Sequence, residues 1–124
     1  MELESLTLDK IASLVQDLGS QLQTVLRTHT IALNDLGTPA WKMPRPILVT
    51  VEQHAPDDFV ACFYDADIYG YGDSIPSSLE DLKKHLVSQH EFLLEESQRV
   101  ELGPVMAEQF LVLQRILENG NSHA

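Results

Sequence analysis

The order of apolar patterns between residues 46 and 97 constrains the fold of this chain more than any other feature. Residues 47–53 alternate between apolar and polar side chains, and residues 59–64 form a more continuous apolar run. Both patterns are typical of strands, and the turn residues between them predict a hairpin. Residues 68–71 predict a short third strand, and an amphipathic helical run follows a glycine-rich corner. The region is therefore predicted to be a β-β-β-α module.

The helix after the corner has recognisable start signals. Pro76 fits only the first turn of a helix, and Ser74 or Ser77 is expected to cap it. Ser77 with Glu80 three residues later matches a capping box. Apolar residues at three- and four-residue steps, joined by one histidine, form the predicted buried stripe: Leu79, Leu82, Leu86, His90 and Leu93. We expect His90 to be a hydrogen-bonded core residue rather than a ligand.

Helical patterns flank the module on both sides. Residues 7–27 carry one apolar stripe and residues 104–117 another, and each stripe predicts a helix. The first stripe can be extended through Leu33 and Leu36. Residues 28–33 are rich in β-branched side chains, so the sequence leaves the end of this first helix open.

A connector is predicted over residues 37–46, which hold three prolines and one glycine. Trp41 lies in it and is expected to plug the edge of the core. We therefore predict a helical segment with its connector in residues 1–45, and the module with a C-terminal helix in residues 46–124. The predicted fold class is α+β, with a small antiparallel sheet of about three strands packed by the helix over residues 76–97.

Charge is unevenly distributed along the chain, which has 8 basic and 19 acidic residues and a net charge of −11. Residues 1–45 hold five acidic and four basic residues, a net charge of −1. Residues 46–124 hold 14 acidic and four basic residues, a net charge of −10. Such a surface repels phosphate backbones, so direct nucleic-acid binding by the monomer is not expected. It attracts basic proteins, although acidity also serves solubility alone.

The number of cysteines and the hydropathy of the sequence indicate in which cellular compartment the protein is expected. Cys62 is the only cysteine, which excludes an intramolecular disulfide and fits a reducing cytoplasm. No apolar run reaches the ~20 residues that span a bilayer, so no membrane insertion is expected. The first residues lack the basic start and the apolar stretch of a signal peptide. We therefore expect a cytoplasmic protein.

Three aspartates near the glycine-rich corner raise the question of a metal site. Asp65 and Asp67 have the spacing that opens an EF-hand loop, and Asp73 follows them. Tyr69 then stands at the fifth loop position, and Pro76 stands where a bidentate glutamate is required. A calcium loop is therefore not expected.

A second hypothesis for these acids is a metal-dependent nuclease, in which carboxylates clamp divalent ions. Asp65, Asp67 and Glu80 are the weak metal candidates for that site. No cofactor is otherwise expected, because the chain has no phosphate loop, dinucleotide fingerprint or nucleophile elbow. Its five histidines and single cysteine lack zinc-ligand spacing.

Tyrosines stand between the acids of the corner, and this mixture favours a surface that contacts another protein over a base-stacking platform. The candidates for a partner interface are the acidic and aromatic residues of this stretch: Asp65, Asp67, Tyr69, Tyr71 and Asp73.

Three pieces of the module resemble the HicB-like antitoxin family. They are the strand Phe-Val-Ala-x-Phe-Tyr-Asp over residues 59–65, the corner Gly-Tyr-Gly-Asp-Ser over residues 70–74, and Leu-Glu-Asp-Leu over residues 79–82. The resemblance covers residues 46–97 and implies a compact β-β-β-α core related to a truncated RNase H fold. It also implies a partner rather than a substrate, because antitoxins of this family bind and block a small basic RNA-cleaving toxin, HicA. The family's usual DNA-binding segment has no counterpart here, and the helical pattern of residues 7–27 is an addition to the family pattern.

The leading hypothesis is a non-catalytic HicB-like protein-interaction module, either an antitoxin-like inhibitor or an orphan relative. The alternative is an enzyme, the metal-dependent nuclease with a truncated RNase H-like site, and a structural subunit is a third reading. We also expect a homo-oligomer. A small sheet has too little surface to cover the apolar stripe of residues 7–27, and short sheets leave open edges that dimers can pair.

Overall fold

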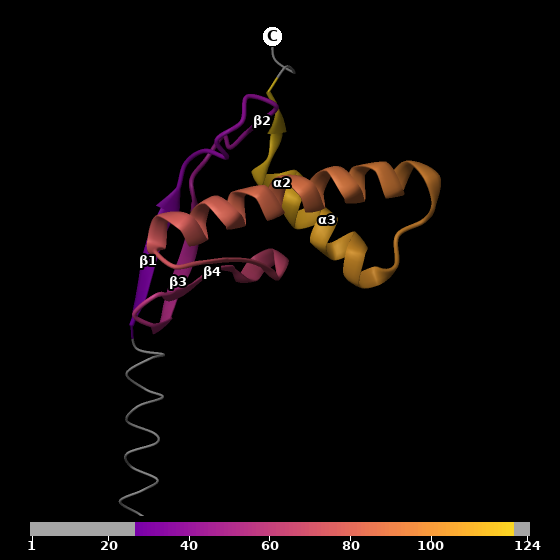
Figure 1. Cartoon of the computed structure of the whole chain (residues 1–124). Helices are drawn as coiled ribbons and strands as arrows, with labels where there is room; N and C mark the ends of the chain where they lie inside the picture. The colour runs from indigo at the N-terminus through magenta and orange to yellow at the C-terminus, as the bar shows by residue number, and fades with distance from the viewer. Residues whose placement is uncertain (1–26, 121–124) are drawn as a thin grey trace, which may run out of the picture.

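The computed structural model describes residues 27–120, which form an α+β unit (Figure 1). This confirms the predicted fold class. The elements in chain order are β1 (Thr28–Leu33), β2 (Trp41–Lys42), β3 (Ile47–Ala55), β4 (Asp58–Phe63), the 3₁₀ turn η1 (Tyr64–Ala66), β5 (Ile68–Gly72), α2 (Ile75–Arg99), α3 (Pro104–Ile116) and β6 (Glu118–Asn119). The predicted helix over residues 7–27 lies outside the described residues, except for its last residue.

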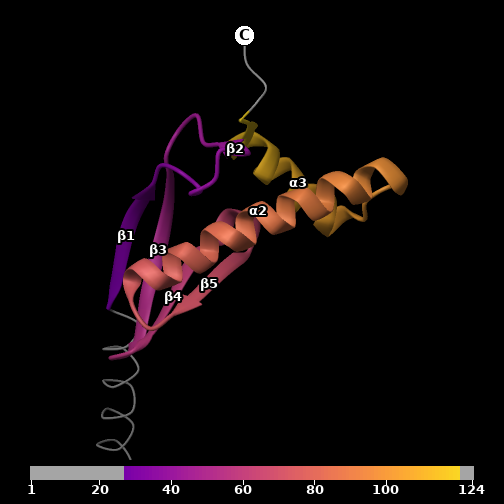
Figure 2. The same ribbon diagram turned by 45° about the horizontal axis from the view of Figure 1, so that its top comes forward.

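The main sheet has four antiparallel strands in the order β1-β3-β4-β5. Figure 2 shows β1 and β5 at its two edges, with α2 running across the strands. A second, two-stranded sheet pairs β2 with β6 and joins the connector to the C-terminal end of the described chain. The three strands expected from the sequence are therefore present as β3, β4 and β5.

The fourth strand, β1, occupies residues 28–33, where the sequence also permitted a continuation of the N-terminal helical stripe. Its register places Ile31 opposite Val49 and Leu33 opposite Ile47, which continues the apolar face of β3. A strand here buries Leu33 in the core. The β-branched residues of the segment fit a pleated, half-buried surface, and this explains the strand.

One face of the sheet packs against α2. The buried side chains of this layer alternate along β3 and β4 and meet the leucine stripe of the helix: Val49, Val51, Phe59, Ala61, Phe63, Leu82, Leu86 and Leu93. Helix and sheet approach most closely at β5, because a Cβ atom at Gly70 would lie 2.2 Å from the backbone nitrogen of Leu82. Glycine is required there by that close approach.

The start of α2 differs in detail from the expected capping box. Ser74 is the N-cap, and its hydroxyl accepts a hydrogen bond from the Ser77 backbone N–H at 3.2 Å. The Ser77 hydroxyl in turn accepts from the Ser74 backbone N–H at 3.0 Å. The box therefore joins Ser74 to Ser77, and Glu80 lies one turn further on, where its carboxylate is 3.4 Å from the Lys83 ammonium.

The C-terminal half of α2 packs against α3 and the connector. Trp41 meets the His90 ring edge-on with centroids 4.4 Å apart, and its indole N–H donates to Glu91 at 3.2 Å. This confirms Trp41 as a plug at the core edge. His90 is buried as expected, with Phe110 of α3 on another side at 5.8 Å. Its Nδ1, however, has no hydrogen-bond partner among residues 27–120.

Candidate protein-interaction surface

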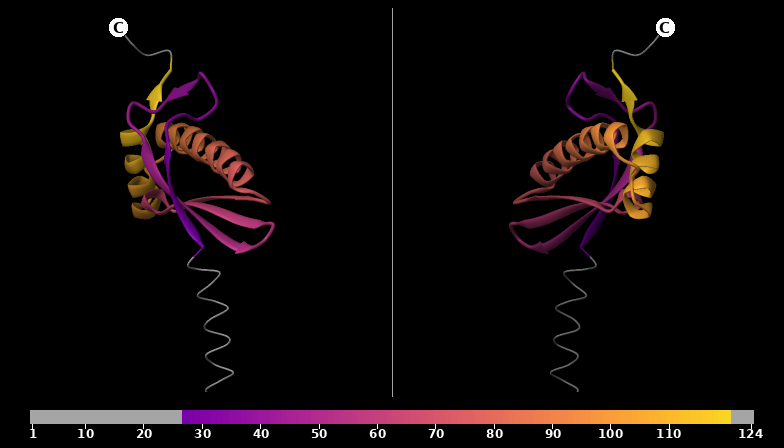
Figure 3. Two further views of the ribbon diagram at one scale, coloured as in Figure 1. Left: turned by 90° about the vertical axis from the view of Figure 1, so that its left-hand side faces the viewer. Right: turned by 90° about the vertical axis from the view of Figure 1, so that its right-hand side faces the viewer.

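The sheet has an open face on the side away from α2. Strand alternation and the strand register place side chains of all four strands there, among them Thr50, Glu52, Cys62, Tyr69 and Tyr71. Figure 3 shows α2 across one side of the sheet. Within the described part of the chain, no helix or strand covers the open face. The face is thus accessible to a partner or to a segment outside residues 27–120.

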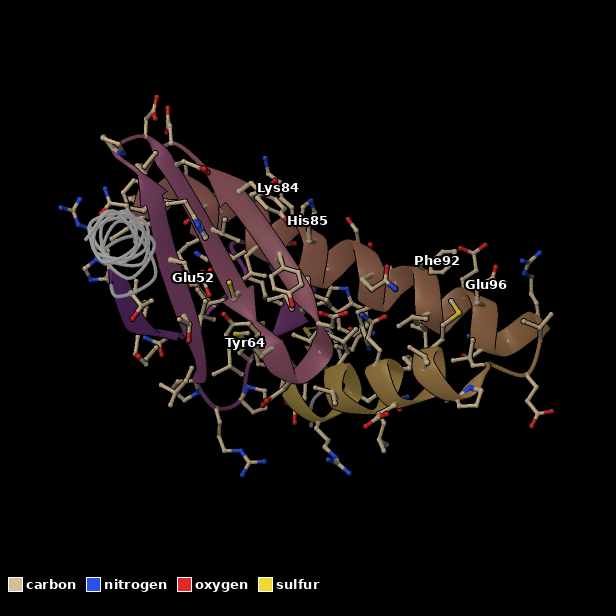
Figure 4. All side chains as sticks on the ribbon, turned by 90° about the horizontal axis from the view of Figure 1, so that it is seen from below. Glu52, Tyr64, Lys84, His85, Phe92 and Glu96 are labelled. Carbon is tan, nitrogen blue, oxygen red and sulfur yellow. The ribbon has the colours of Figure 1, made fainter. Side chains whose placement is uncertain are left out.

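Two tyrosine–carboxylate pairs lie side by side on this face. The Tyr64 hydroxyl donates a short hydrogen bond to Glu52 Oε2, and the Tyr69 hydroxyl donates to Asp67 Oδ1 at 2.6 Å. The two rings meet edge to face, with centroids 6.2 Å apart and planes at 78°. Figure 4 shows Glu52 and Tyr64 together on the sheet. We call Glu52, Tyr64, Asp67 and Tyr69 the tyrosine–carboxylate cluster.

The turn between β4 and β5 positions half of the cluster. Asp67 follows η1 in the left-handed conformation, with φ of 56°, and its N–H donates to the Tyr64 carbonyl at 3.1 Å. Aspartate is one of the few non-glycine residues that visit this conformation routinely, because its short polar side chain bonds locally. The left-handed residue ends the 3₁₀ turn and starts β5, so that Tyr69 returns beside Tyr64.

Each carboxylate oxygen of Glu52 has a hydrogen-bond partner. Oε2 accepts from Tyr64, and the His54 ring nitrogen Nε2 lies 3.0 Å from Oε1. His54 and Glu52 are two residues apart on β3 and therefore share the open face. The carboxylate is fixed between them, and its side chain is 25% exposed.

The cluster changes the acidity of its tyrosines. The hydrogen bond to the Glu52 carboxylate raises the pKa of Tyr64 well above its usual range. The bond to Asp67 raises the pKa of Tyr69 to about 12. Burial raises the pKa of the Cys62 thiol, which is opposite Tyr69 in the sheet and is 2% exposed. These directions mean that the tyrosines stay protonated donors and that Cys62 is a thiol rather than a reactive thiolate at neutral pH.

The chemistry of the open face suits a cationic group. Tyr64 is 54% exposed and Tyr71 60% exposed, so their rings offer flat aromatic surface beside fixed carboxylates. Arginine stacks on aromatic faces and pairs with carboxylates in the same contact. Leu48, at 69% exposure, adds apolar area on the same face. The arrangement can hold basic side chains together with apolar ones.

A groove of about 360 Å³ borders the cluster between β5 and the two long helices. Asp67 and Tyr69 form one wall, and His85, Gln89 and Gln109 form part of the other. Gln89 donates to the Gln109 side chain at 2.8 Å, and Gln109 donates to the Ala66 carbonyl at 2.7 Å. The groove is polar and extends the cluster toward α2.

The predicted interface residues fall in different settings. Asp67 and Tyr69 belong to the cluster, and Tyr71 lies two residues further along the same face of β5. Asp65 is exposed on η1. Asp73 instead accepts a hydrogen bond from the Ser77 hydroxyl at 3.1 Å, at the start of α2. Contact of these residues with a partner stays a prediction.

The weak metal candidates do not share one pocket. Asp65 and Asp67 line a shallow pocket beside α3, whereas Glu80 lines a separate pocket with Lys83. In residues 27–120, no group of three or more His, Cys, Asp or Glu side chains is placed to hold a metal ion. The described structure therefore adds no carboxylate cluster in support of the nuclease alternative.

Glu52 and Tyr64 are the cluster members that are absent from the predicted interface residues. Period-two alternation places Glu52 on the outer face of β3, but nothing local indicates which residue of another element faces it. The register between β3 and β4 shifts between Gln53 and Ala55, next to Glu52. A β-bulge of this kind is set by tertiary packing, and so the approach of Tyr64 to Glu52 follows only from the folded structure.

Comparison of the chain with protein-family models, curated proteins and solved structures gave no significant match. A search of the described helices found none with the length and hydropathy needed to cross a membrane.

Proposed function

We propose that this chain is a non-catalytic protein-interaction module that binds a small basic protein through its open sheet face. The observation that carries the proposal is the tyrosine–carboxylate cluster, which holds two carboxylates beside the exposed ring of Tyr64 and the half-buried ring of Tyr69. A carboxylate that already accepts a tyrosine hydrogen bond keeps further lone pairs for an arginine or lysine.

The charge of the chain supports the same partner class. Residues 46–124, which build three strands of the sheet and both long helices, carry a net charge of −10. A field of this sign raises the encounter rate with a basic protein and repels acidic ones. Binding is therefore expected to weaken steeply as salt screens the field.

The resemblance of residues 46–97 to HicB-like antitoxins suggests what the basic protein is. In that family the partner is a small basic RNA-cleaving toxin, and we propose that this chain is an antitoxin-like inhibitor or an orphan relative. A cytoplasmic location is part of the proposal, because such a partner acts on cellular RNA and the lone Cys62 suits a reducing compartment.

The test measures binding of the full chain to the small basic protein encoded beside its gene, by calorimetry at low and at physiological salt. The variant Glu52→Gln/Asp67→Asn removes both charges of the cluster and keeps its shape, since asparagine also tolerates the left-handed conformation of Asp67. The matched control Glu95→Gln/Glu101→Gln makes the same charge change at exposed positions on and after α2.

We expect the cluster variant to bind at least ~10-fold more weakly, a loss of about 1.4 kcal/mol. The control should lose only the small part due to the overall field. Equal losses in the two variants would show that net charge alone attracts the partner and that the cluster has no special role. A neighbouring gene that encodes no small basic protein removes the antitoxin-like form of the proposal.

A further inference from the structure

The two edges of the main sheet differ in whether their outward-facing backbone N–H and C=O groups have hydrogen-bond partners. At the β5 edge, side chains of α2 bond the strand: Asp81 Oδ2 accepts from the Tyr71 N–H at 2.8 Å, and the His85 Nδ1–H donates to the Tyr69 carbonyl at 2.5 Å. Figure 4 shows His85 on α2 beside this edge. An incoming strand would have to displace both side chains.

The β1 edge has no such cover within the described residues. The Gln53 N–H donates to the Arg27 carbonyl at 2.9 Å, so residues 27 and 53 form a hydrogen-bonded pair. Pairs alternate along an antiparallel ladder, and therefore Thr28, Thr30 and Ala32 turn their N–H and C=O groups away from β3. All three are exposed, and no other part of residues 27–120 is bonded to these groups.

The composition of β1 leaves this edge without the usual protection. Natural edge strands carry charges, prolines or bulges that prevent pairing with another chain. The six residues Thr-His-Thr-Ile-Ala-Leu of β1 contain no lysine, arginine, acid, proline or glycine. Their register with β3 is continuous, without a bulge. The strand is therefore a regular template for one more antiparallel strand.

We propose that this strand is the β1 strand of a second copy of the chain, paired antiparallel about a two-fold axis at Thr30. In this register Thr30 faces Thr30 of the second copy, and Thr28 faces its Ala32. All three outward-facing residues then form hydrogen-bonded pairs, each of which exchanges two backbone bonds. On the α2 side, His29 faces Ile31 of the second copy.

This register is self-complementary in side chains as well as in backbone groups. No pair within it places like charges opposite each other, and threonine pairs directly across from threonine are favourable. A two-fold contact requires the same patch on both copies, which β1 satisfies by itself. The pairing joins the two four-stranded sheets into one, with the β5 strands at its outer ends.

Charge favours this surface over the rest of the molecule. Each chain carries −11, so two copies repel unless they meet where the charge is low. Residues 1–45, which contain β1, carry a net charge of only −1. Contact through β1 keeps the acidic parts of the two copies apart. The inference goes beyond the proposed binding of a basic protein, and either can fail without the other.

The test replaces Thr30, the residue on the proposed two-fold axis, by lysine and by glutamate in two variants of the full chain. In Thr30→Lys two lysines would face each other, and in Thr30→Glu two glutamates, so each variant should be monomeric at about 50 µM. A one-to-one mixture places lysine opposite glutamate and should restore the dimer. The unmodified chain should have twice its 13.9 kDa mass by sedimentation. Gln98→Lys and Gln98→Glu, exposed on α2, are controls that should stay dimeric.

Several results would overturn the inference. One is a monomeric mass for the unmodified chain at this concentration. Another is a dimer that Thr30→Lys leaves intact, which would place the contact elsewhere, with residues 7–26 as the next surface to examine. A third is failure of the mixture to associate while each variant keeps the circular dichroism of the unmodified chain.

If the Thr30 variants do not fold, a measurement on the unmodified chain still tests the pairing of the two β1 strands. Amide exchange by NMR should show protection of Thr28, Thr30 and Ala32 that is lost on dilution. The amides of His29, Ile31 and Leu33, which face β3, should stay protected at both concentrations. Fast exchange of Thr28, Thr30 and Ala32 at high concentration contradicts the pairing.

Discussion

At the scale of single residues, Gly70 is a position where an added Cβ atom would collide with the backbone of α2. A Cβ there would lie 2.4 Å from the Ser78 carbonyl oxygen and 2.2 Å from the Leu82 nitrogen. Both are backbone atoms of α2, so the helix as a whole would have to move away from β5. Gly70→Ala is therefore expected to lower the free energy of unfolding by about 3 kcal/mol, the upper range for overpacked cores.

Urea denaturation of the full chain measures this effect, with Gly103→Ala as its control. At Gly103 no atom lies within 4 Å of an added Cβ, and its φ of −63° suits alanine. The control should change stability by no more than about 0.5 kcal/mol. Equal effects of the two substitutions would mean that the close approach of α2 to β5 contributes nothing to the fold.

His90 is the residue that should make stability depend on pH near neutrality. Burial between Trp41 and Phe110 disfavours its charged form and lowers its pKa, which the nearby Glu91 carboxylate opposes more weakly. In the unfolded chain histidine titrates near pH 6.5. The unfolded state therefore takes up the proton first, and stability is lost as the pH falls below about 6.5 toward the lowered pKa of the folded state.

Thermal unfolding at pH 7.5 and at pH 5.5 tests this assignment. His90→Leu replaces the titrating ring by an apolar side chain at the same buried position. The melting temperature of this variant should therefore fall less between the two pH values. The difference between the two proteins isolates His90 from the other histidines and the acids. Parallel curves would assign the pH dependence to other groups.

At the scale of elements, the sequence predicts the pieces whose pattern is local. The hairpin, the third strand and both helices of the described chain follow from alternation, turn residues and leucine spacing, and they appear as β3, β4, β5, α2 and α3. β1 does not follow in this way, because the helical stripe can be extended through Leu33 while the β-branched residues of Thr28–Leu33 oppose a helix, so the sequence leaves the end of the first helix open. Pairing with β3 decides between the two, and that is a tertiary effect.

The same limit applies to the candidate site. Asp67 and Tyr69 are close in sequence, and so their part of the cluster is predictable from the corner. Glu52 lies on β3 and Tyr64 lies on η1, directly after β4, and they meet because of a register between β3 and β4 that a bulge adjusts. The capping box shows the converse: the Ser77 and Glu80 pattern is present, but Ser74 starts the helix one turn earlier.

The contact of α2 with the β5 edge gives a prediction at this scale. Asp81→Ala removes the acceptor of the Tyr71 N–H, and hydrogen bonds to charged groups contribute about 1.5–3 kcal/mol. The Tyr71 amide should then exchange at least ~10-fold faster, as NMR would show. Glu80→Ala, whose carboxylate contacts Lys83 rather than β5, is the control. Equal exchange of Tyr71 in both variants would mean that Asp81 does not protect the edge.

At the scale of the whole molecule, the two proposed surfaces lie on different parts of the sheet. The tyrosine–carboxylate cluster lies on the open face and extends from Glu52 on β3 to Tyr69 on β5, whereas the proposed dimer contact uses the backbone groups at the β1 edge (Figure 2). A dimer through β1 uses the edge of the sheet rather than its open face, and therefore leaves both clusters accessible. A basic partner with two binding sites, or two linked partners, would gain avidity from such a dimer.

The bonds that Asp81 and His85 make to β5 also decide how large an assembly of this chain can become. Fibrous growth needs a molecule with two available edges, so that each added copy offers a new one. Here the second edge is already occupied by the chain's own side chains. Addition of one copy consumes the remaining edge, and the association stops at two. The same contact that fixes α2 on the sheet thus makes the proposed assembly self-limiting and protects it from indefinite polymerisation.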